Sequence, residues 1–429
     1  MNTPIQISAA DLATMLDAAR TRTLALIDGY ATAQWLGPRL TTVNPPLWEV
    51  GHLGWFQEFW CLRHGLKQND SLLTNADALY DSALVPHQSR WDLPLPDVTA
   101  TLGYLADVQG TVFARLLESD RDPDLRYFAQ LCAYHEEMHC EAMSYTRQTL
   151  AYPELPGLPR ITADTTDCVG DVKIEGGRFQ LGAIDDATFV FDNEKWSHSV
   201  NVRPFRMART PVTNAQFTEF VDAGGYQEQR WWSKEGWAWR VTAKAESPLY
   251  WHRTGSAWWW RCFDREQPLQ IDEPVIHVNW HEATAWCRWA GRRLPTEAEW
   301  EFAAATIPEA PGIKQRYPWG DTPPSVKTAN LYDAGGRCAP VHALAAGDSA
   351  WGVRQMIGNV WEWTEDWFQP YPGFVRDPYA EYSEPWFGNH KVLRGGCHQT
   401  RGALIRNTWR NFYTPDRRDV YAGFRTCAQ

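Results

Sequence analysis

The sequence has no long hydrophobic run and no excess of basic residues, and both absences exclude classes of protein. No apolar run approaches the ~20 residues that a membrane-spanning helix requires. Lys and Arg number 41 against 52 Asp and Glu, and the resulting charge of −11 argues against nucleic acid or an anionic membrane as a partner. The start, Met1–Pro4, lacks the basic and apolar regions of a signal peptide. We therefore expect a cytoplasmic protein.

Cysteine is the next scarce feature. The nine cysteines are scattered and include no CxxC pair, so neither a zinc ribbon nor a disulfide framework is indicated. Tryptophan, by contrast, is abundant: the chain has 25, most of them after residue 230. This pattern predicts a loop-rich domain in which indole rings supply much of the buried area. A chain of 429 residues is long enough for two or three domains.

Three histidines form the pattern with the clearest chemistry. His135 and His139 lie in a stretch without Gly or Pro from Leu125 to Ala151. Residues four apart lie on the same face of a helix, so both imidazoles can point at one metal ion. His52 stands near the start of another apolar helix. Three neutral imidazoles would leave half of an octahedral coordination shell open. Facial-triad non-haem iron sites have the same open half, and here a third His would replace their usual carboxylate.

Neighbouring carboxylates offer an alternative ligand set. Glu136, Glu137 or Glu141 would complete a site with two histidines and one carboxylate, which is the commoner iron arrangement. Glu141 follows His139 by two residues, about 200° around the helix, so we expect it to face away from the ion. Taken alone, a His pair at this spacing is more often structural than ligating.

The sequence predicts helices in the first 155 residues of the chain. Apolar residues recur at helical spacing in four segments, and proline-containing or charged connectors separate them. We expect an antiparallel four-helix bundle over residues 1–155, whose core is a usual place for a metal, and a linker over 156–171. The four segments are Ala9–Trp35, Leu47–His64, Val98–Glu118 and Leu125–Ala151.

From residue 172 to 429 the amino-acid composition and the length of the apolar runs change. Gly, Pro, Trp and Asn recur and apolar runs are short, which indicates an α+β domain with much irregular structure. Helical spacing is confined to Thr213–Ala223 and Glu282–Ala290, and we expect a third short helix at Thr296–Ala305.

Five motifs of the second domain carry a resemblance to a known family. In chain order they are Arg292–Glu301, Tyr317–Gly320, Gly358–Trp363, Leu393–Gly396 and Ala422–Arg425. In this order they resemble the formylglycine-generating-enzyme (sulfatase-modifying factor) family, whose fold is similar to a C-type lectin. The histidine region resembles the DinB-like four-helix bundle, and the pairing of the two domains is similar to the ergothioneine-pathway sulfoxide synthases.

The resemblance implies an activity and a site. It implies an Fe(II)- and O2-dependent enzyme that joins a chalcogen atom to C2 of the imidazole of hercynine, Nα-trimethylhistidine. His52, His135 and His139 would be the iron ligands, and Asn411 and Phe412 would line the hercynine site. Family members use a tyrosine to deliver a proton or an electron; at most one of four candidates would do so here, and the sequence does not choose among Tyr371, Tyr379, Tyr382 and Tyr413.

Three positions depart from the branch of the family that uses γ-glutamylcysteine. That branch has an Asp where this chain has Tyr413, a Gln where it has Met138, and paired arginines of which only Arg90 remains. A site without those polar partners should not favour a doubly anionic donor. The segment 407–418 resembles the selenoneine synthase branch, so we expect a selenosugar donor, with free cysteine or γ-glutamylcysteine as the alternative.

The trimethylammonium group of hercynine cannot donate hydrogen bonds, so aromatic faces are its natural host. Phe412, Trp409 and Trp363 are candidates by position. We expect the 409–413 segment to face the bundle's histidines, which would put the active site between the domains. Two rival functions are a lectin-like binding module without catalysis and a DinB-type zinc thiol transferase.

Overall fold

The computed structural model describes residues 7–65, 70–118, 122–155, 160–162, 168–186 and 188–429. Its contacts divide the chain into two compact units. Unit 1 comprises Met1–Pro153 with Asp186–Phe189, and unit 2 comprises Glu154–Asp185 with Val190–Gln429. Residues 156–159 and 163–167 of the expected linker lie outside the described residues.

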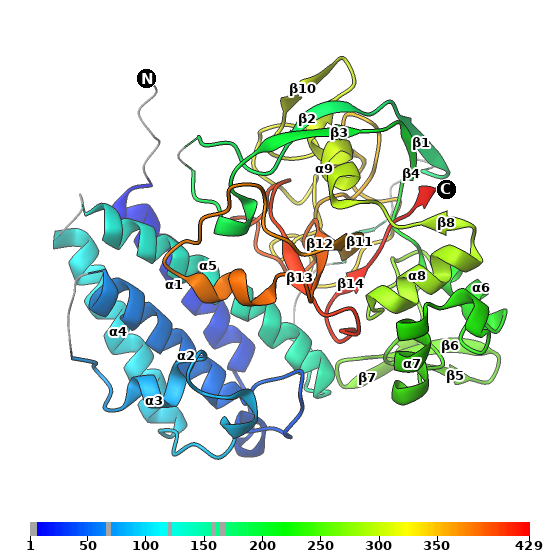
Figure 1. Ribbon diagram of the computed structural model, residues 1–429. Coiled ribbons are helices and arrows are strands. Elements are labelled where there is room, and N and C mark those ends of the chain that lie inside the picture. The colour runs from blue at the N-terminus through cyan, green and yellow to red at the C-terminus, as the bar shows by residue number, and fades with distance from the viewer. Residues whose placement is uncertain (1–6, 66–69, 119–121, 156–159, 163–167, 187) are drawn as a thin grey trace. The chain divides into compact units, whose positions relative to one another are not determined.

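Unit 1 is built on the expected four long helices, coloured blue to cyan-green in Figure 1. Two of the expected segments are divided. The first ends at Ile27 and is followed by a short 3-10 turn, Thr32–Trp35, and the second continues from an α-helix into a π-helical turn, Phe59–His64. The long helices are α1 (Ala9–Ile27), α2 (Pro46–Glu58), α4 (Val98–Glu118) and α5 (Pro123–Thr149).

Local chemistry explains where α1 and α5 begin. The Ser8 and Asp11 side chains form a capping box at the start of α1. The Asp122 carboxylate accepts from the backbone of Asp124 and Leu125, and Pro123 occupies the first helical position of α5. These signals fix the residue at which α5 begins.

A fifth, short helix of unit 1 was not predicted. This helix, α3 (Ala76–Tyr80), lies in the long crossover between α2 and α4. Its last residues lack intrahelical partners for their carbonyl groups, as at any helix end. The Leu79 carbonyl instead accepts from the Trp48 indole at 2.7 Å, which ties α3 to α2.

Unit 2 combines short strands with short helices, as expected. A four-stranded sheet has the order β1-β4-β15-β8, a second has the order β13-β12-β11-β14, and β2-β3, β10-β9 and β5-β6-β7 form smaller sheets. Its core includes Phe179, Met207, Trp300 and Phe302. The strands are β1 (Asp171–Ile174), β2 (Gly177–Leu181), β3 (His198–Val202), β4 (Phe205–Ala208), β5 (Trp251–Thr254), β6 (Ala257–Cys262), β7 (Arg265–Pro268), β8 (Arg292–Arg293), β9 (Thr306–Ile307), β10 (Ala310–Lys314), β11 (Trp361–Trp367), β12 (Lys391–Arg394), β13 (Asn411–Tyr413), β14 (Ala422–Gly423) and β15 (Cys427–Ala428).

The three expected helices of unit 2 are present, with a fourth that was not expected. They are α6 (Asn214–Asp222), α8 (Trp280–Trp289) and α9 (Glu297–Ala305); the unexpected one is α7 (Lys234–Ala243). The sequence of α7 contains Gly236, two tryptophans and a β-branched pair, and only Gly236 is buried. A helix that buries so little carries no clear apolar stripe.

The motifs that carry the family resemblance build the scaffold of unit 2. Gly358 adopts a left-handed φ of +82°, and a Cβ there would lie 2.5 Å from the Asn330 carbonyl oxygen. Asn359 is fully buried and hydrogen-bonds Asn330, the Ala339 backbone and Gln355. This motif is therefore a tight turn that anchors several loops.

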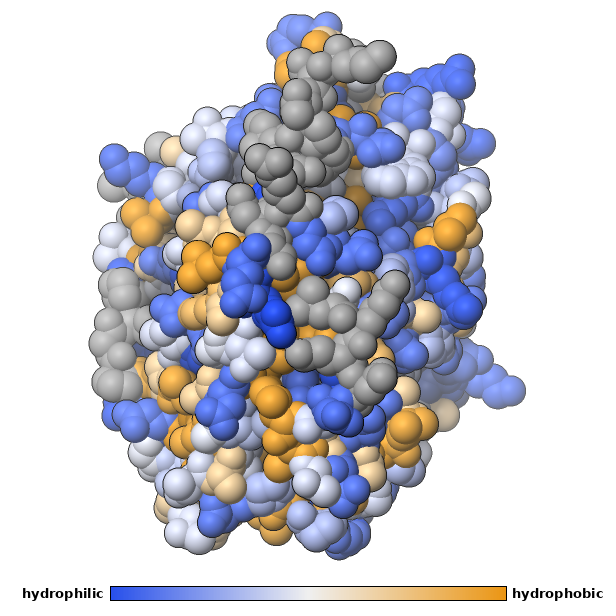
Figure 2. Space-filling view, turned by 90° about the vertical axis from the view of Figure 1, so that its left-hand side faces the viewer, coloured by the Kyte–Doolittle hydropathy of each residue, from blue (hydrophilic) through white to orange (hydrophobic). Residues whose placement is uncertain are grey.

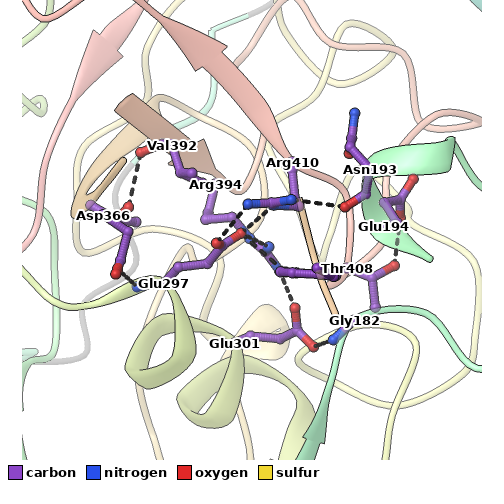
Figure 3. A network of polar contacts seen from close by, with 12 residues as sticks. Gly182, Asn193, Glu194, Glu297, Glu301, Asp366, Val392, Arg394, Thr408 and Arg410 are labelled. Carbon is purple, nitrogen blue, oxygen red and sulfur yellow. Dashed lines mark hydrogen bonds and ion pairs between the residues drawn. The ribbon is translucent and has the colours of Figure 1, made fainter. Parts of the chain in front are cut away.

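A buried ion network joins α9 to β12 and the chain before β13 (Figure 3). Arg394 donates to Glu297 at 2.8 Å and to Glu301 at 2.5 Å, and Arg410 donates to Glu297 at 2.7 and 3.1 Å. Both arginines are at most 1% exposed. Since buried ions must be paired, these contacts fix the position of the segment that leads into Asn411.

No described helix has both the length and the apolarity that a membrane crossing needs. The face drawn in Figure 2 intersperses apolar side chains among hydrophilic ones.

Candidate metal centre

The three predicted ligands come together inside unit 1. His52 lies on α2, and His135 and His139 lie one turn apart on α5. One ligand atom from each lies within 4.8 Å of the other two, and among the described residues this is the only such group of three or more His, Cys, Asp or Glu side chains. The ring centroids of His135 and His139 are 4.5 Å apart. The i, i+4 spacing thus places two imidazoles on the face that meets α2.

Burial keeps two of these imidazoles neutral. His52 is 2% exposed and His135 is 3% exposed. Desolvation lowers the pKa of His52 and of His135 well below the usual value, and the neighbouring His139 adds to both shifts. The side chain of His139 keeps 21% of its exposure, so the group is open on the His139 side.

The backbone of α3 fixes the tautomer of His52. His52 Nδ1 lies 2.8 Å from the Tyr80 carbonyl oxygen. A carbonyl oxygen only accepts, so Nδ1 carries the proton and Nε2 is left with a free lone pair. Gly51 makes this approach possible, because a Cβ there would lie 2.3 Å from the Tyr80 ring.

A carboxylate fixes the tautomer of His139 in the same way. His139 Nδ1 lies 2.8 Å from Oε1 of Glu49, which is 2% exposed. The Nδ1–H group donates to the carboxylate, and Nε2 again remains available. A histidine whose second nitrogen donates to a carboxylate or carbonyl is the usual arrangement in metal sites.

Aromatic rings hold the planes of the other two imidazoles. Phe56 stacks on His135 with a centroid separation of 3.5 Å and an interplanar angle of 2°. Trp48 stacks on His52 at 5.0 Å and 9°. Both aromatic residues lie on α2, one turn before and one turn after His52. The walls of the centre are therefore apolar, which restricts water.

The carboxylates considered as alternative ligands are engaged elsewhere. Glu136 receives hydrogen bonds from Arg20 at 2.8 and 3.2 Å, and Glu137 pairs with Arg22 at 2.8 Å. Both arginines lie on α1 and are buried. These two carboxylates thus join α5 to α1, and Glu141 is not part of the histidine group either.

The donor set fits a divalent transition metal. Neutral imidazole is a good ligand for iron, copper, nickel and zinc, with metal–nitrogen bonds of ~2.0–2.1 Å. Two of the three side chains present Nε2 because their Nδ1 atoms are occupied. The three ligand atoms lie within 4.8 Å of one another, and they would move closer together on binding one ion.

The predicted substrate residues of unit 2 lie on an edge strand. β13 pairs antiparallel with β12, with Phe412 opposite Val392. Phe412 stacks on Phe368 at 4.0 Å and 14°, and the residue is half-buried, whereas Trp363 and Trp409 are buried at 0% and 3%. Of the three proposed aromatic hosts, Phe412 is therefore the one that is not fully buried.

The candidate tyrosines have different surroundings. Tyr371 is buried and its hydroxyl donates to Glu297 at 3.2 Å, so it belongs to the ion network. Tyr382 packs against Phe412, with centroids 5.8 Å apart, and Tyr379 packs against Tyr382 at 6.0 Å. Tyr413 lies opposite Lys391 in the β12–β13 pair. The assignment of one of them to catalysis stays a prediction.

The two remaining site candidates lie in unit 1. Met138 precedes His139 and is half-buried. Arg90 is 9% exposed, and its guanidinium lies 3.7 Å over the Trp48 ring while donating to Asn44 at 2.6 Å and to the Val85 carbonyl at 3.4 Å. This guanidinium is engaged within the bundle.

Sequence reasoning missed three residues that position the histidines: Glu49, Phe56 and Tyr80. A signal existed for the first two. Glu49 and Phe56 stand three residues before and four after His52, so they share its helix face. No signal existed for Tyr80, because its contribution is a backbone carbonyl at the end of a five-residue helix.

Known protein families match the sequences of both units. Residues 15–143 match the DinB superfamily, and residues 159–429 match the family described as sulfatase-modifying factor enzyme 1-like domain. The formylglycine-generating enzyme of Streptomyces coelicolor is 36% identical over 293 residues, which is 60% of this chain and 88% of that protein. This likeness leaves the remaining 40% of the chain uncovered.

Two relatives match nearly the whole chain. The hercynine oxygenase of Mycolicibacterium thermoresistibile is 38% identical over 431 residues, covering 97% of this chain and 94% of that protein. The hercynine oxygenase of Mycobacterium tuberculosis is 39% identical over 423 residues, covering 97% and 98%. With both domain types in this order and identity at this level along the chain, the protein belongs to the hercynine oxygenase family of oxidoreductases.

Proposed function

We propose that this protein is an Fe(II)- and O2-dependent enzyme that forms a carbon–selenium bond at C2 of the imidazole of hercynine, with a selenosugar as the donor. The observation that carries the iron centre is the convergence of His52, His135 and His139, two of which hold Nε2 free through contacts at Nδ1. The family's hercynine oxygenases support the substrate.

Burial keeps two of the predicted metal ligands uncharged. The imidazoles of His52 and His135 are neutral because burial lowers their pKa values. Fe(II) held by these three histidines would supply the redox chemistry that the reaction needs, because triplet O2 reacts slowly with closed-shell partners such as imidazole. Neutral ligands would leave the ion its full positive charge, which favours an anionic selenolate or thiolate. The apolar walls of Phe56 and Trp48 limit the access of water.

For hercynine, the half-buried position of Phe412 supports a role in binding the trimethylammonium group. A cation over an aromatic face is attracted by ~0.5–2 kcal/mol. Asn411 supplies the neighbouring amide, although its Oδ1 already accepts from the Phe412 backbone at 2.8 Å. We propose that these two residues bind hercynine and that one tyrosine among Tyr379, Tyr382 and Tyr413 assists the reaction.

The choice of donor rests on Tyr413, Met138 and Arg90. The first two offer no charge to a peptide donor. The guanidinium of Arg90 is stacked on Trp48 and hydrogen-bonded to Asn44, which supports its being unavailable to a donor carboxylate. A charge-assisted hydrogen bond is worth ~1.5–3 kcal/mol, so the loss of two would weaken γ-glutamylcysteine by a factor of hundreds. A sugar-linked selenol needs hydroxyl partners and loses nothing.

A competition experiment tests the donor. Protein loaded anaerobically with Fe(II) is mixed with hercynine and equal amounts of selenosugar, cysteine and γ-glutamylcysteine, then exposed to O2, and the products are resolved by mass spectrometry. We expect the selenium product to dominate. A kcat/KM for γ-glutamylcysteine equal to or above that for the selenosugar would overturn the donor proposal.

Ergothioneine sulfoxide synthesis is the second candidate, with cysteine or γ-glutamylcysteine as the donor. The identity of 38–39% to named hercynine oxygenases favours it. A zinc thiol transferase and a binding module without catalysis differ from both by metal content, because neither requires iron. Metal analysis of anaerobically purified protein separates these classes.

A further inference from the structure

We propose that Glu49 is the positioning residue of the metal centre: its carboxylate orients His139 and balances part of the charge of the bound ion. This inference rests on the proposed metal site. It adds the Glu49 carboxylate, which contacts a predicted ligand but does not itself bind the ion.

Glu49 is placed for this role by the helix that carries His52. It stands three residues before His52 on α2, so the two side chains share a face. Its Oε1 atom lies 2.8 Å from His139 Nδ1, on α5. One residue of α2 thus orients a histidine of α5, and the contact spans the two helices that supply all three predicted ligands.

Other buried glutamates of the bundle have an arginine or several hydrogen-bond partners, which Glu49 lacks among the described residues. Glu136 and Glu137 are each paired with a buried arginine. Glu58 accepts from the Tyr104 hydroxyl, the Ser71 hydroxyl and the Leu72 backbone amide. Among the residues that the structure describes, no Lys or Arg nitrogen lies within 4.0 Å of the Glu49 carboxylate, and its one ion-pair contact is with His139. Arg90 influences it only at longer range.

A buried carboxylate without a nearby cation is costly, and a cation one imidazole away removes that cost. Glu49 is 2% exposed. Taking an isolated carboxylate out of water carries a large desolvation cost. His139 would hold a divalent ion through its other ring nitrogen, and the ion and the Glu49 carboxylate would then attract each other across the ring. The carboxylate also makes the imidazole a stronger ligand, because it favours positive charge on the ring.

The substitution Glu49→Gln isolates the charge. Glutamine has the same shape and keeps an oxygen that accepts from His139 Nδ1. The matched control is Glu58→Gln, the same change at a residue of equal burial nine positions later on α2. The full-length protein is stripped of metal, and Co(II) is used as a redox-stable probe. Its dissociation constant is measured by competition with a chelating indicator, and its d–d absorption spectrum is recorded.

We expect Glu49→Gln to weaken Co(II) binding by about 10- to 100-fold and to shift the d–d bands, as is usual when such a partner of a ligand is lost. Glu58→Gln should keep both the affinity and the spectrum. The metal-free Glu49→Gln protein should unfold at the wild-type temperature or above, because an uncompensated buried charge is gone. The rise in unfolding temperature on adding Co(II) should be smaller than for wild type.

Wild-type affinity and spectrum in folded Glu49→Gln protein would overturn the charge-balancing role of Glu49 and leave the metal centre standing. No Co(II) binding by the wild type would instead overturn the metal centre itself. If Glu49→Gln does not fold, Glu49→Asp serves: it keeps the charge but shortens the reach, and a wild-type affinity and spectrum there would equally exclude positioning through the hydrogen bond.

Discussion

Phe56 lies flat on His135, with ring centroids 3.5 Å apart and planes within 2° of parallel. The two residues come from α2 and α5, so the stack sets the orientation of an imidazole on one helix from a ring on another. Since a metal accepts a ligand only along the direction of its lone pair, ring orientation controls affinity.

We expect Phe56→Leu to weaken Co(II) binding by about two- to twelvefold, the equivalent of the ~0.5–1.5 kcal/mol of an aromatic pair. The control is Phe59→Leu, which removes a ring that stacks on Trp55 at 5.3 Å. Both variants should lose stability, and only the first should lose affinity. Equal affinities in titrations of the two variants would show that the stack does not orient the ligand.

Removing a ligand should separate metal binding from folding. We expect His139→Ala to abolish turnover and lower Co(II) affinity by at least 100-fold, because two imidazoles remain where three bound. Its circular dichroism should match that of the metal-free wild type. His64→Ala, a change at an exposed histidine of the same bundle, should alter neither property. Retention of stoichiometric Co(II) by His139→Ala would contradict the three-histidine centre.

Gly51 and Gly110 offer a matched pair of helix glycines. A Cβ at Gly51 would lie 2.3 Å from the Tyr80 ring, whereas a Cβ at Gly110 on α4 meets nothing within 4 Å. We expect Gly51→Ala to lower the free energy of unfolding and, by displacing the Tyr80 carbonyl from His52, to weaken metal binding. Gly110→Ala should stabilise the protein by ~0.4–1 kcal/mol. Chemical denaturation of the two variants measures both effects; stabilisation by Gly51→Ala would show that α3 adjusts freely.

Glu273 gives the stability of the protein a pH dependence. Desolvation raises the pKa of this carboxyl from 4.5 to about 7, with Arg160 opposing the shift. The folded state therefore holds the proton more tightly than the unfolded state, and the stability that this contributes is complete below pH 4.5 and is lost as the pH rises to 7.

We expect Glu273→Gln to remove that decline, because glutamine stays neutral at every pH. The unfolding temperature of the variant relative to wild type should be higher at pH 8 than at pH 5. A constant difference across this range, measured by calorimetry in buffers of equal ionic strength, would show that the carboxyl titrates normally.

The pair His135 and His139 and the long helices could be predicted from the sequence because their signals are local. The i, i+4 spacing of His135 and His139 and the stretch without Gly or Pro define a helix and its face without knowledge of the rest. The helix Val98–Glu118 has the predicted bounds. The family resemblance supplied His52, which no local pattern connects to the other two.

What could not be predicted depends on contacts between distant segments. The Tyr80 carbonyl reaches His52 across 28 residues, and Glu49 reaches His139 across 90. Helix α7 was not predicted because its tryptophans are only partly buried and do not form a regular apolar face. The position of the 409–413 segment relative to the histidines, and with it the role of Asn411, stays a prediction.

The contacts at Nδ1 of His52 and His139 have a consequence for the order of assembly. Both imidazoles are aimed by groups of the protein, so the site exists before an ion reaches it. A zinc finger must capture its metal in order to fold. Here the bundle can complete its fold first and be loaded afterwards through the side on which His139 is exposed. With the iron centre that we propose, protein that loses its iron to oxidation would then persist as a folded apoprotein that fresh Fe(II) restores, without a new round of synthesis.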